Sequence, residues 1–207
     1  MPASPFTSSL KSAGLGLVLL LGMAASCKRD NAKNVTVSPA SAAAAKVQLD
    51  ILRDSVDVKW RNMTESDDQK LALTRLLLRE LHGQPGRTET QLKALEMANA
   101  RLKARRYDQQ TMASSARIDQ YDTAQDSLLN ALYPVAAPSG GAPTENARNF
   151  IEGIQQLDAG VVGFRVIYDD AAKRYNNYLS LHQAELESLG GKYAGLKPMP
   201  LFTIGAK

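Results

Sequence analysis

The feature that most constrains the fold is a run of apolar side chains between Phe150 and Tyr178 whose spacing alternates strictly between four and three residues. This spacing places the side chains on one stripe of an α-helix that packs along its length against other helices. A β-strand cannot use it, because neighbouring side chains of a strand point to opposite faces. The members of the stripe are Phe150, Ile154, Leu157, Val161, Phe164, Tyr168, Ala171, Tyr175 and Tyr178. The stripe predicts a long core helix.

Two further helices are expected before this one. Ser38-Pro39 is a typical helix start, and neither Gly nor Pro occurs from residue 40 to residue 82. The segment 82–86 (HGQPG) predicts a tight reversal. Thr88 and Gln91 then form a capping box at the start of a second segment without Gly or Pro, which we expect to be helical as far as Tyr133.

The three expected helices have matched lengths. They cover about residues 39–82, 89–133 and 145–189, so each holds roughly 44 residues and spans about 65 Å. Rods of equal length joined by short connections, of which the second is 134–143 (PVAAPSGGAP), favour antiparallel packing. We therefore predict an all-α fold, an up-down-up antiparallel bundle of three long helices with coiled-coil-like seams. The tail, 192–207, is expected to fold onto one end.

Three glycines, Gly153, Gly160 and Gly163, lie inside the third expected helix. Each costs about 1 kcal/mol relative to alanine in a helix. They indicate either places where a neighbouring helix comes close or a local weakness of the helix.

The N-terminal segment has the pattern of a secretory signal. Lys11 precedes an apolar run, and residues 13–26 are all apolar or small, which is shorter than the roughly 20 residues needed to span a bilayer. The run ends in 24–27 (AASC), which resembles a bacterial lipobox although Ala24 stands where Leu is usual, and Cys27 is the single cysteine of the chain. We expect a lipoprotein signal peptide at 1–26, lipidation of Cys27 by fatty acyl chains such as palmitate, and a flexible tether at 27–37. An ordinary signal peptide or an uncleaved anchor is the alternative.

Part of the helical domain resembles the LemA family. The resemblance is carried by Arg165, by Tyr175-Asn176 with Tyr168-Asp169 seven residues before it, and by the tail 195–202 (GLKPMPLF). Other matches are Tyr133-Pro134, Ala100-Arg101 and the spacing of Leu52, Val56 and Trp60. The chain departs from the family at Asp169, where Asn is usual, and in its lipobox-like segment, which replaces a transmembrane helix. The resemblance implies a LemA-like helical bundle domain at 38–207, held outside the cytoplasmic membrane and without an established enzyme activity.

Motifs for catalysis or metal binding are scarce. With two histidines and one cysteine, multi-His and Cys-rich zinc sites are excluded, and no Gly-rich phosphate loop or nucleophile elbow occurs. Asp67-Asp68 and Asp169-Asp170 are adjacent on their helices and point about 100° apart, which is typical of solvated charges. A formal charge of +4, spread along the chain, gives no reason to expect nucleic acid. We expect no enzyme activity, no cofactor and no metal. The alternative is an envelope enzyme or metal-binding protein with a site formed from sequence-distant carboxylates and histidines.

Two groups of residues are candidates for a role. The first lies in the tail, where apolar side chains either recognise a partner or cap the core: Tyr193, Leu196, Met199, Leu201 and Phe202. The second comprises polar groups expected on the packed faces, where they hold the register of the helices: Arg101, Arg165, Tyr168, Tyr175 and Asn176. In a three-helix bundle His82, His182 and the tail all lie at the end far from the anchor.

The sequence therefore predicts a lipid-anchored, non-enzymatic protein of the bacterial cell envelope. It would attach to a membrane through Cys27, face the periplasm or the exterior, and serve as a spacer or adaptor for another envelope component.

Overall fold

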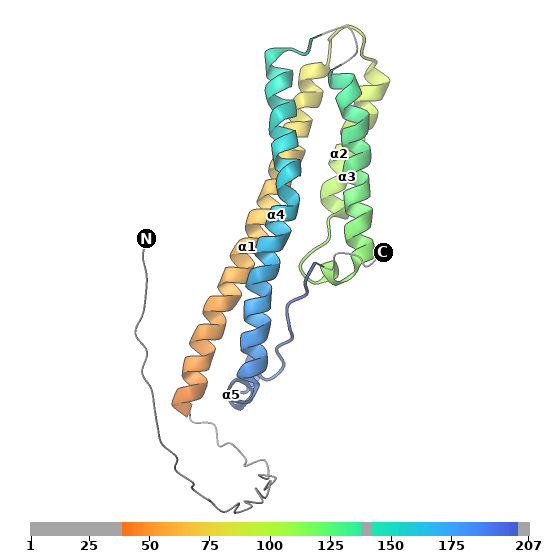
Figure 1. Ribbon diagram of the computed structural model, residues 1–207. Helices are drawn as coiled ribbons and strands as arrows, with labels where there is room; N and C mark the ends of the chain where they lie inside the picture. The colour runs from red at the N-terminus through yellow and green to blue at the C-terminus, as the bar shows by residue number, and fades with distance from the viewer. Residues whose placement is uncertain (1–38, 138–141, 203–207) are drawn as a thin grey trace, which may run out of the picture. The chain divides into compact units, whose positions relative to one another are not determined.

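The computed structural model describes residues 39–137 and 142–202, all of which belong to the second of the two units into which the chain divides, Val37–Lys207. This part is helical and contains no strand among the described residues, so the prediction of an all-α fold is confirmed (Figure 1). The signal peptide, Cys27 and the tether lie outside the described residues. The helices are α1 (Pro39–Leu81), α2 (Glu89–Arg105), α3 (Ser115–Ala136), α4 (Glu145–Leu181) and α5 (Gln183–Ser188), with short 3-10 helices at Thr111–Ala113 and Gly191–Tyr193.

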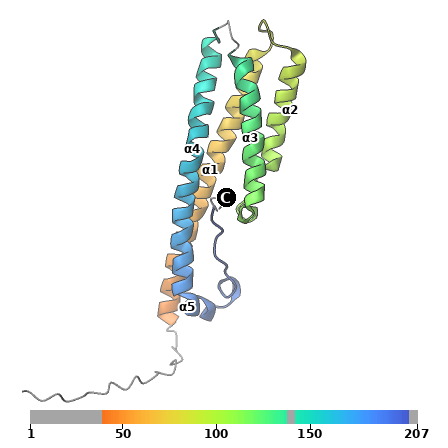
Figure 2. The ribbon, with the colours of Figure 1, turned by 45° about the vertical axis from the view of Figure 1, so that its right-hand side comes forward.

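The chain makes four main passes instead of the expected three. The two long helices α1 and α4 lie side by side, and α2 and α3 form a hairpin next to the half of α1 that precedes the α1–α2 connection (Figures 1 and 2). The order is up-down-up-down. The expected second rod, 89–133, is wrong, because the chain turns back after Arg105.

The turn between α2 and α3 forms without Gly or Pro, which explains why the sequence pattern hid it. The Asp108 carboxylate accepts hydrogen bonds from the backbone N–H groups of Gln110 and Thr111, at 2.9 and 2.7 Å, and from the Thr111 hydroxyl at 2.9 Å. The hydrogen bonds from Thr111 hold the pKa of Asp108 below its usual value. A short polar side chain that bonds to the backbone just after it competes with the helical pattern and stabilises a turn.

Replacing Asp108 with alanine is expected to lower the urea midpoint of unfolding, because the backbone N–H groups of the turn lose their acceptor. The loss should be largest at pH 7 and should shrink as the pH falls through the lowered pKa of Asp108, where the carboxyl of the native chain becomes protonated. The exposed neighbour Gln110, changed to alanine, provides the control. Equal midpoints for the native chain and Asp108→Ala at pH 7 would show that this side chain does not hold the turn.

Helix α3 extends beyond the expected end at Tyr133 and includes Pro134. Proline lacks the N–H that continues a helix, and an interior proline usually ends or kinks the helix. Here the last turn is closed by the Ala137 N–H, which donates to the Tyr133 carbonyl at 2.9 Å. Arg87 also donates to the carbonyls of Val135 and Ala136 at 3.2 and 3.3 Å, so a cation satisfies the end of the helix.

The predicted core helix is confirmed as α4. Ile154, Tyr168 and Tyr175 are at most 1% exposed, and the other members of the stripe are buried or partly buried. At Gly153 an added Cβ would lie 2.8 Å from Leu73 Cδ1 of α1, so the expected close approach of a neighbouring helix is confirmed there. At Gly163 a Cβ would meet no atom within 4 Å, and the packing of this chain gives no reason for that glycine.

None of the helices described by the structure is both long enough and apolar enough to cross a membrane.

Candidate functional site: a buried polar cluster

Charged and polar side chains gather where the α2–α3 turn rests on the middle of α1. We call the group Asp67, Lys70, Arg106, Tyr121 and Gln125 the polar cluster. Its members come from α1, the α2–α3 turn and α3. Lys70, Tyr121 and Gln125 are 3%, 4% and 7% exposed, which is unusual for residues of this kind in a helical bundle.

Asp67 is the centre of the polar cluster. Its carboxylate accepts hydrogen bonds from the Tyr121 hydroxyl, from Gln125 Nε2 at 2.5 Å and from Arg106 Nη1 at 2.9 Å. Arg106 also donates to the Thr64 carbonyl at 3.2 Å. Burial, together with the negative charge of Asp67, raises the pKa of Tyr121, so this hydroxyl acts as a hydrogen-bond donor. One aspartate thus ties α1 to the α2–α3 turn and to α3.

Lys70 extends the cluster to the fourth main helix. Its Nζ donates to Gln125 Oε1 on α3 and to Asp158 Oδ1 on α4, the latter at 2.9 Å. Because the ammonium group is nearly inaccessible, these two acceptors replace the water it would otherwise bind. Lys70 therefore links α1, α3 and α4.

A second ion pair lies beside the polar cluster. Arg165 of α4 donates two parallel hydrogen bonds to the Asp122 carboxylate, at 2.8 and 2.6 Å, and one to the Tyr107 hydroxyl at 3.2 Å. Bidentate pairs of this kind combine strength with a fixed orientation. Burial raises the pKa of Tyr107. The pair fastens the α2–α3 hairpin to α4.

The cavity enclosed by these groups is small. It has a volume of about 30 Å³ and is lined by Asp67, Lys70, Arg106, Tyr121 and Arg165, among others. A cavity needs about 10–15 Å³ for one water molecule, so there is room for about two. The polar groups around it bind one another across the bundle. This arrangement can fix the register of the helices and hold water, but it leaves no space for a substrate.

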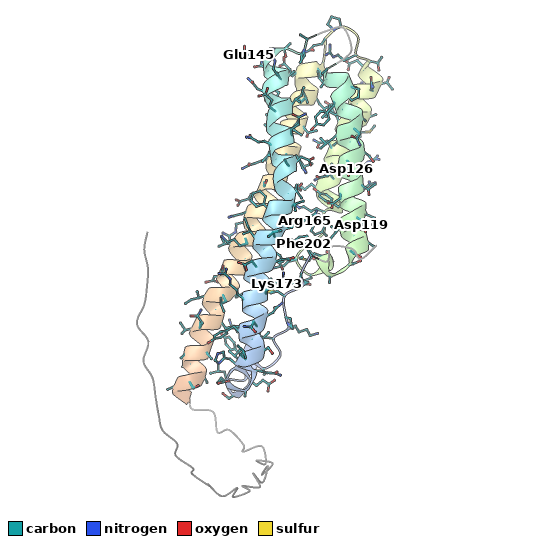
Figure 3. All side chains as sticks on the ribbon, in the orientation of Figure 1. Asp119, Asp126, Glu145, Arg165, Lys173 and Phe202 are labelled. Carbon is teal, nitrogen blue, oxygen red and sulfur yellow. The ribbon has the colours of Figure 1, made fainter. Side chains whose placement is uncertain are left out.

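The C-terminal tail closes the lower side of the cluster with aromatic rings. Phe202 lies 5.9 Å from the ring of Tyr107 and 5.6 Å from that of Tyr168, and the guanidinium of Arg165 is 5.2 Å from the Phe202 ring (Figure 3). Trp60 of α1 completes this layer, 5.5 Å from Tyr168. Edge-to-face rings and a cation over a ring both contribute beyond the area they bury.

Backbone contacts hold the tail along α4. Asn176 donates to the Met199 carbonyl at 2.8 Å and accepts from the Met199 N–H at 2.6 Å, so its amide pairs with the tail like a neighbouring strand. The Tyr168 hydroxyl donates to the Pro200 carbonyl at 3.1 Å, and the Phe202 N–H donates to Asp169 at 2.9 Å. Burial raises the pKa of Tyr168 to about 12.

The tail residues predicted to recognise a partner or to cap the core do not lie where they were expected. Tyr193, Leu196, Met199, Leu201 and Phe202 are partly buried against the core. The tail starts near the beginning of α1, where Tyr193 donates to Asp50 at 3.1 Å, and runs up along α4 to the α2–α3 turn. Its expected place at the end shared with His82 is wrong, because the additional pass reverses the direction of the last long helix.

The predicted polar residues of the packed faces separate into two groups. Arg165, Tyr168 and Asn176 lie on the packed side of α4 and bind the hairpin or the tail, and Tyr175 is 1% exposed. Arg101 is exposed, so its predicted place on a packed face is wrong. Helix α2 turns Asn99 and Leu102 inward, and Arg101 points about 100° away from Leu102. His82 and His182 lie at opposite ends of the long helices, not together.

The polar cluster is only weakly indicated by the sequence. The sequence predicts a solvated charge at Asp67, and the segment 64–70 (TESDDQK) around it is polar on all sides, with no apolar pattern that would place it on a packed face. Two stretches of the sequence together indicate the cluster. The first expected helix has a polar stretch at 64–70, and the second has a stretch poor in large apolar residues at 103–115. Both are accounted for if the two stretches contact each other. Their facing positions follow only once the hairpin is known.

At the opposite end from α5, His82 has two carboxylate partners, Glu96 at 3.0 Å from Nε2 and Glu89 at 3.2 Å from Nδ1. The hydrogen bond to Glu96, and then that to Glu89, raises the pKa of His82 above its usual 6.5. A raised pKa stabilises the fold at pH values below 6.5, and this contribution is lost as the pH rises through the folded pKa.

Replacing Glu96 with glutamine is expected to lower the pKa of His82 further than the same change at Glu89, because the Glu96 bond is the larger cause. The pKa is read from the imidazole proton shifts in an NMR titration. An unchanged His82 pKa in Glu96→Gln would contradict the pairing.

Among the described residues, no group of three His, Cys, Asp or Glu side chains is arranged to hold a metal ion.

The Asn99 side chain, 8% exposed, donates to the Leu71 carbonyl at 3.1 Å and joins α2 to α1.

Comparisons with models of protein families, with curated proteins and with solved structures gave no match for this chain. The resemblance to the LemA family therefore stays a prediction from the residues that carry it.

Proposed function

We propose that this chain is a lipid-anchored, non-enzymatic protein of the bacterial cell envelope, of LemA type, which serves as a spacer or adaptor for another envelope component. The observation that carries the non-enzymatic part is the closed polar cluster. Its charged groups bind one another around a cavity of about 30 Å³. Sites for small molecules are typically concave spaces of several hundred Å³ with polar groups directed into them, and the polar cluster does not enclose such a space.

The anchoring part of the proposal is supported by the sequence. The single cysteine follows a short apolar run and three small residues, where a lipoprotein signal requires it. Cys27 and the first residue of α1, Pro39, are twelve residues apart, which reach at most about 40 Å when fully extended. Since α1 has 43 residues and a length of about 65 Å, the α1–α2 connection would be the part able to extend farthest from the membrane.

The experiment compares the native chain with Cys27→Ser in bacterial cells supplied with labelled palmitate. We expect the native chain to carry the label, to begin at Cys27 and to fractionate with membranes, and Cys27→Ser to carry no label. Cross-linking in cells, followed by mass spectrometry, then identifies which envelope proteins the native chain captures and Cys27→Ser does not. A native chain that still begins at Met1 and fractionates with the aqueous phase would overturn the anchor.

The second candidate is an envelope enzyme or metal-binding protein, and its support is the burial of sequence-distant charged groups in the polar cluster. The conservative change Lys70→Met tests it. Methionine fills a similar volume without the charge, so a chain that stays folded and keeps its cross-linked partners counts against chemistry at this site. A folded Lys70→Met chain that no longer captures the cross-linked partners would favour the second candidate.

A further inference from the structure

Helix α4 carries apolar side chains on the side opposite to its packed face. Val162, Val166 and Ile167 are 68%, 60% and 50% exposed, the largest exposures of aliphatic side chains on this helix apart from Leu181 near its end. Together with Ala159 and Gly163 they recur at intervals of three and four residues, which places them on one face. We call Ala159, Val162, Gly163, Val166 and Ile167 the outer stripe.

The glycine of the outer stripe has no explanation within this chain. A Cβ at Gly163 would meet no atom within 4 Å, unlike at Gly153, where it would approach Leu73. Glycine in the middle of an exposed helix lowers helix propensity. In helix pairs, a glycine at this position lets a second backbone come close. The outer stripe therefore combines exposed apolar side chains with a point suited to close helix approach.

The charges that flank the outer stripe indicate what covers it. Glu152 and Arg174 are exposed and lie eleven residues before and eleven residues after Gly163, three helical turns on either side. Both are therefore on the same face as the outer stripe. If a second α4 crosses at Gly163 in the antiparallel direction, Glu152 of each copy faces Arg174 of the other. The same operation brings Ala159 opposite Ile167.

A parallel arrangement would place Glu152 against Glu152 and Arg174 against Arg174, and like charges in these positions repel. The antiparallel arrangement is isologous and gives two ion pairs of opposite charge at the ends of a shared apolar strip. Arg174 also binds Asp170 within its own helix at 2.6 Å, seven residues after Gly163 on the same face, so in the dimer its guanidinium would be shared between Asp170 and Glu152 of the second copy.

We propose that the outer stripe is the contact surface of a homodimer in which two α4 helices pack antiparallel around Gly163. The surface of one helix face is modest, so the dimer is weak, with a dissociation constant on the order of micromolar. The pairing goes beyond the proposed function and does not depend on lipidation of Cys27. It places the two α1 starts at opposite ends of the dimer, so two anchored copies paired in this way would lie along the membrane instead of standing upright on it.

The test measures the mass of the full chain by sedimentation equilibrium over a range of micromolar concentrations, with Cys27→Ser as the background so that the lipid does not contribute. We expect a reversible dimer. Glu152→Arg and Arg174→Glu should each weaken it about tenfold, since each replaces two opposite pairs with two like pairs. The double change Glu152→Arg/Arg174→Glu should restore the original affinity, and Glu65→Arg, an exposed reversal on α1, is the control.

Gly163→Leu provides an independent variant. A Cβ at this position meets no atom of its own chain within 4 Å, and leucine favours the helix, so the monomer should fold with unchanged circular dichroism and a higher melting temperature. The added side chain should abolish the dimer. A background chain that stays monomeric at the highest concentration overturns the proposal. So does a dimer that Gly163→Leu leaves intact, or one that the double charge reversal fails to restore.

Discussion

Replacing Asp67 with alanine is expected to lower the free energy of unfolding by roughly 3–5 kcal/mol, the usual cost of removing one partner from a buried ion pair. Arg106 would be left without its most buried acceptor, and the Tyr121 hydroxyl and Gln125 Nε2 would lose theirs. Since these donors belong to the α2–α3 turn and to α3, the loss should loosen the α2–α3 hairpin from α1.

The adjacent aspartate offers a matched control. Asp68 binds Arg106 at 2.9 Å and Lys103 at 3.2 Å, but its side chain is 39% exposed. Exposed pairs typically contribute at most about 1 kcal/mol, so Asp68→Ala should cost no more than that. Urea unfolding followed by circular dichroism measures both variants. Equal costs for Asp67→Ala and Asp68→Ala would show that the polar cluster does not have the energetic role we assign to it.

The second large effect is expected in the tail. Phe202→Ala should lower the free energy of unfolding by about 2–3 kcal/mol, somewhat less than for a fully buried phenylalanine because this ring is only partly buried. The ring contacts Tyr107 and Tyr168 and lies next to the guanidinium of Arg165. Deleting residues 197–207 should cost more, since it also removes the backbone groups that bind Asn176 and Tyr168.

Lys197→Ala, an exposed change in the same tail, is the control and should leave the melting temperature unchanged. The comparison decides between the two roles left open for the tail. A large fall in melting temperature for Phe202→Ala means that the tail caps the core. An unchanged melting temperature together with a lost cross-linked partner would instead indicate recognition.

The sequence predicted the helical class, the start of α1, the reversal at 82–86 and the packed face of α4, because each depends on local patterns that span one helix. The hairpin was missed because its turn is made by Asp108, whose effect comes from hydrogen bonds that a search for Gly and Pro does not detect. Pro134 was missed for the opposite reason. The last turn of α3 that contains it is instead held by hydrogen bonds from Arg87 to the carbonyls of Val135 and Ala136, 48 and 49 residues away in the sequence.

The candidate site was harder to predict than the fold. Asp67 and Lys70 have the composition of a solvated helix face, and their burial depends on Gln125 and Arg106, which come from beyond a turn that the sequence did not reveal. The place of the tail also depends on the turn that the sequence did not reveal. Once the number of passes changes from three to four, its attachment point moves from the end at His82 to the end at Asp50.

The four-pass topology underlies the site, the position of the tail and the direction of the helices, and one distance tests it directly. Spin labels are placed at Val47→Cys on α1 and Lys192→Cys in the tail, in a Cys27→Ser background, and their separation is measured by pulsed electron paramagnetic resonance. Because Tyr193 contacts Asp50 at 3.1 Å, we expect a short distance, set mainly by the lengths of the two labels. A separation near 50 Å, about the distance along α1 from Val47 to its end at Leu81, would contradict the topology.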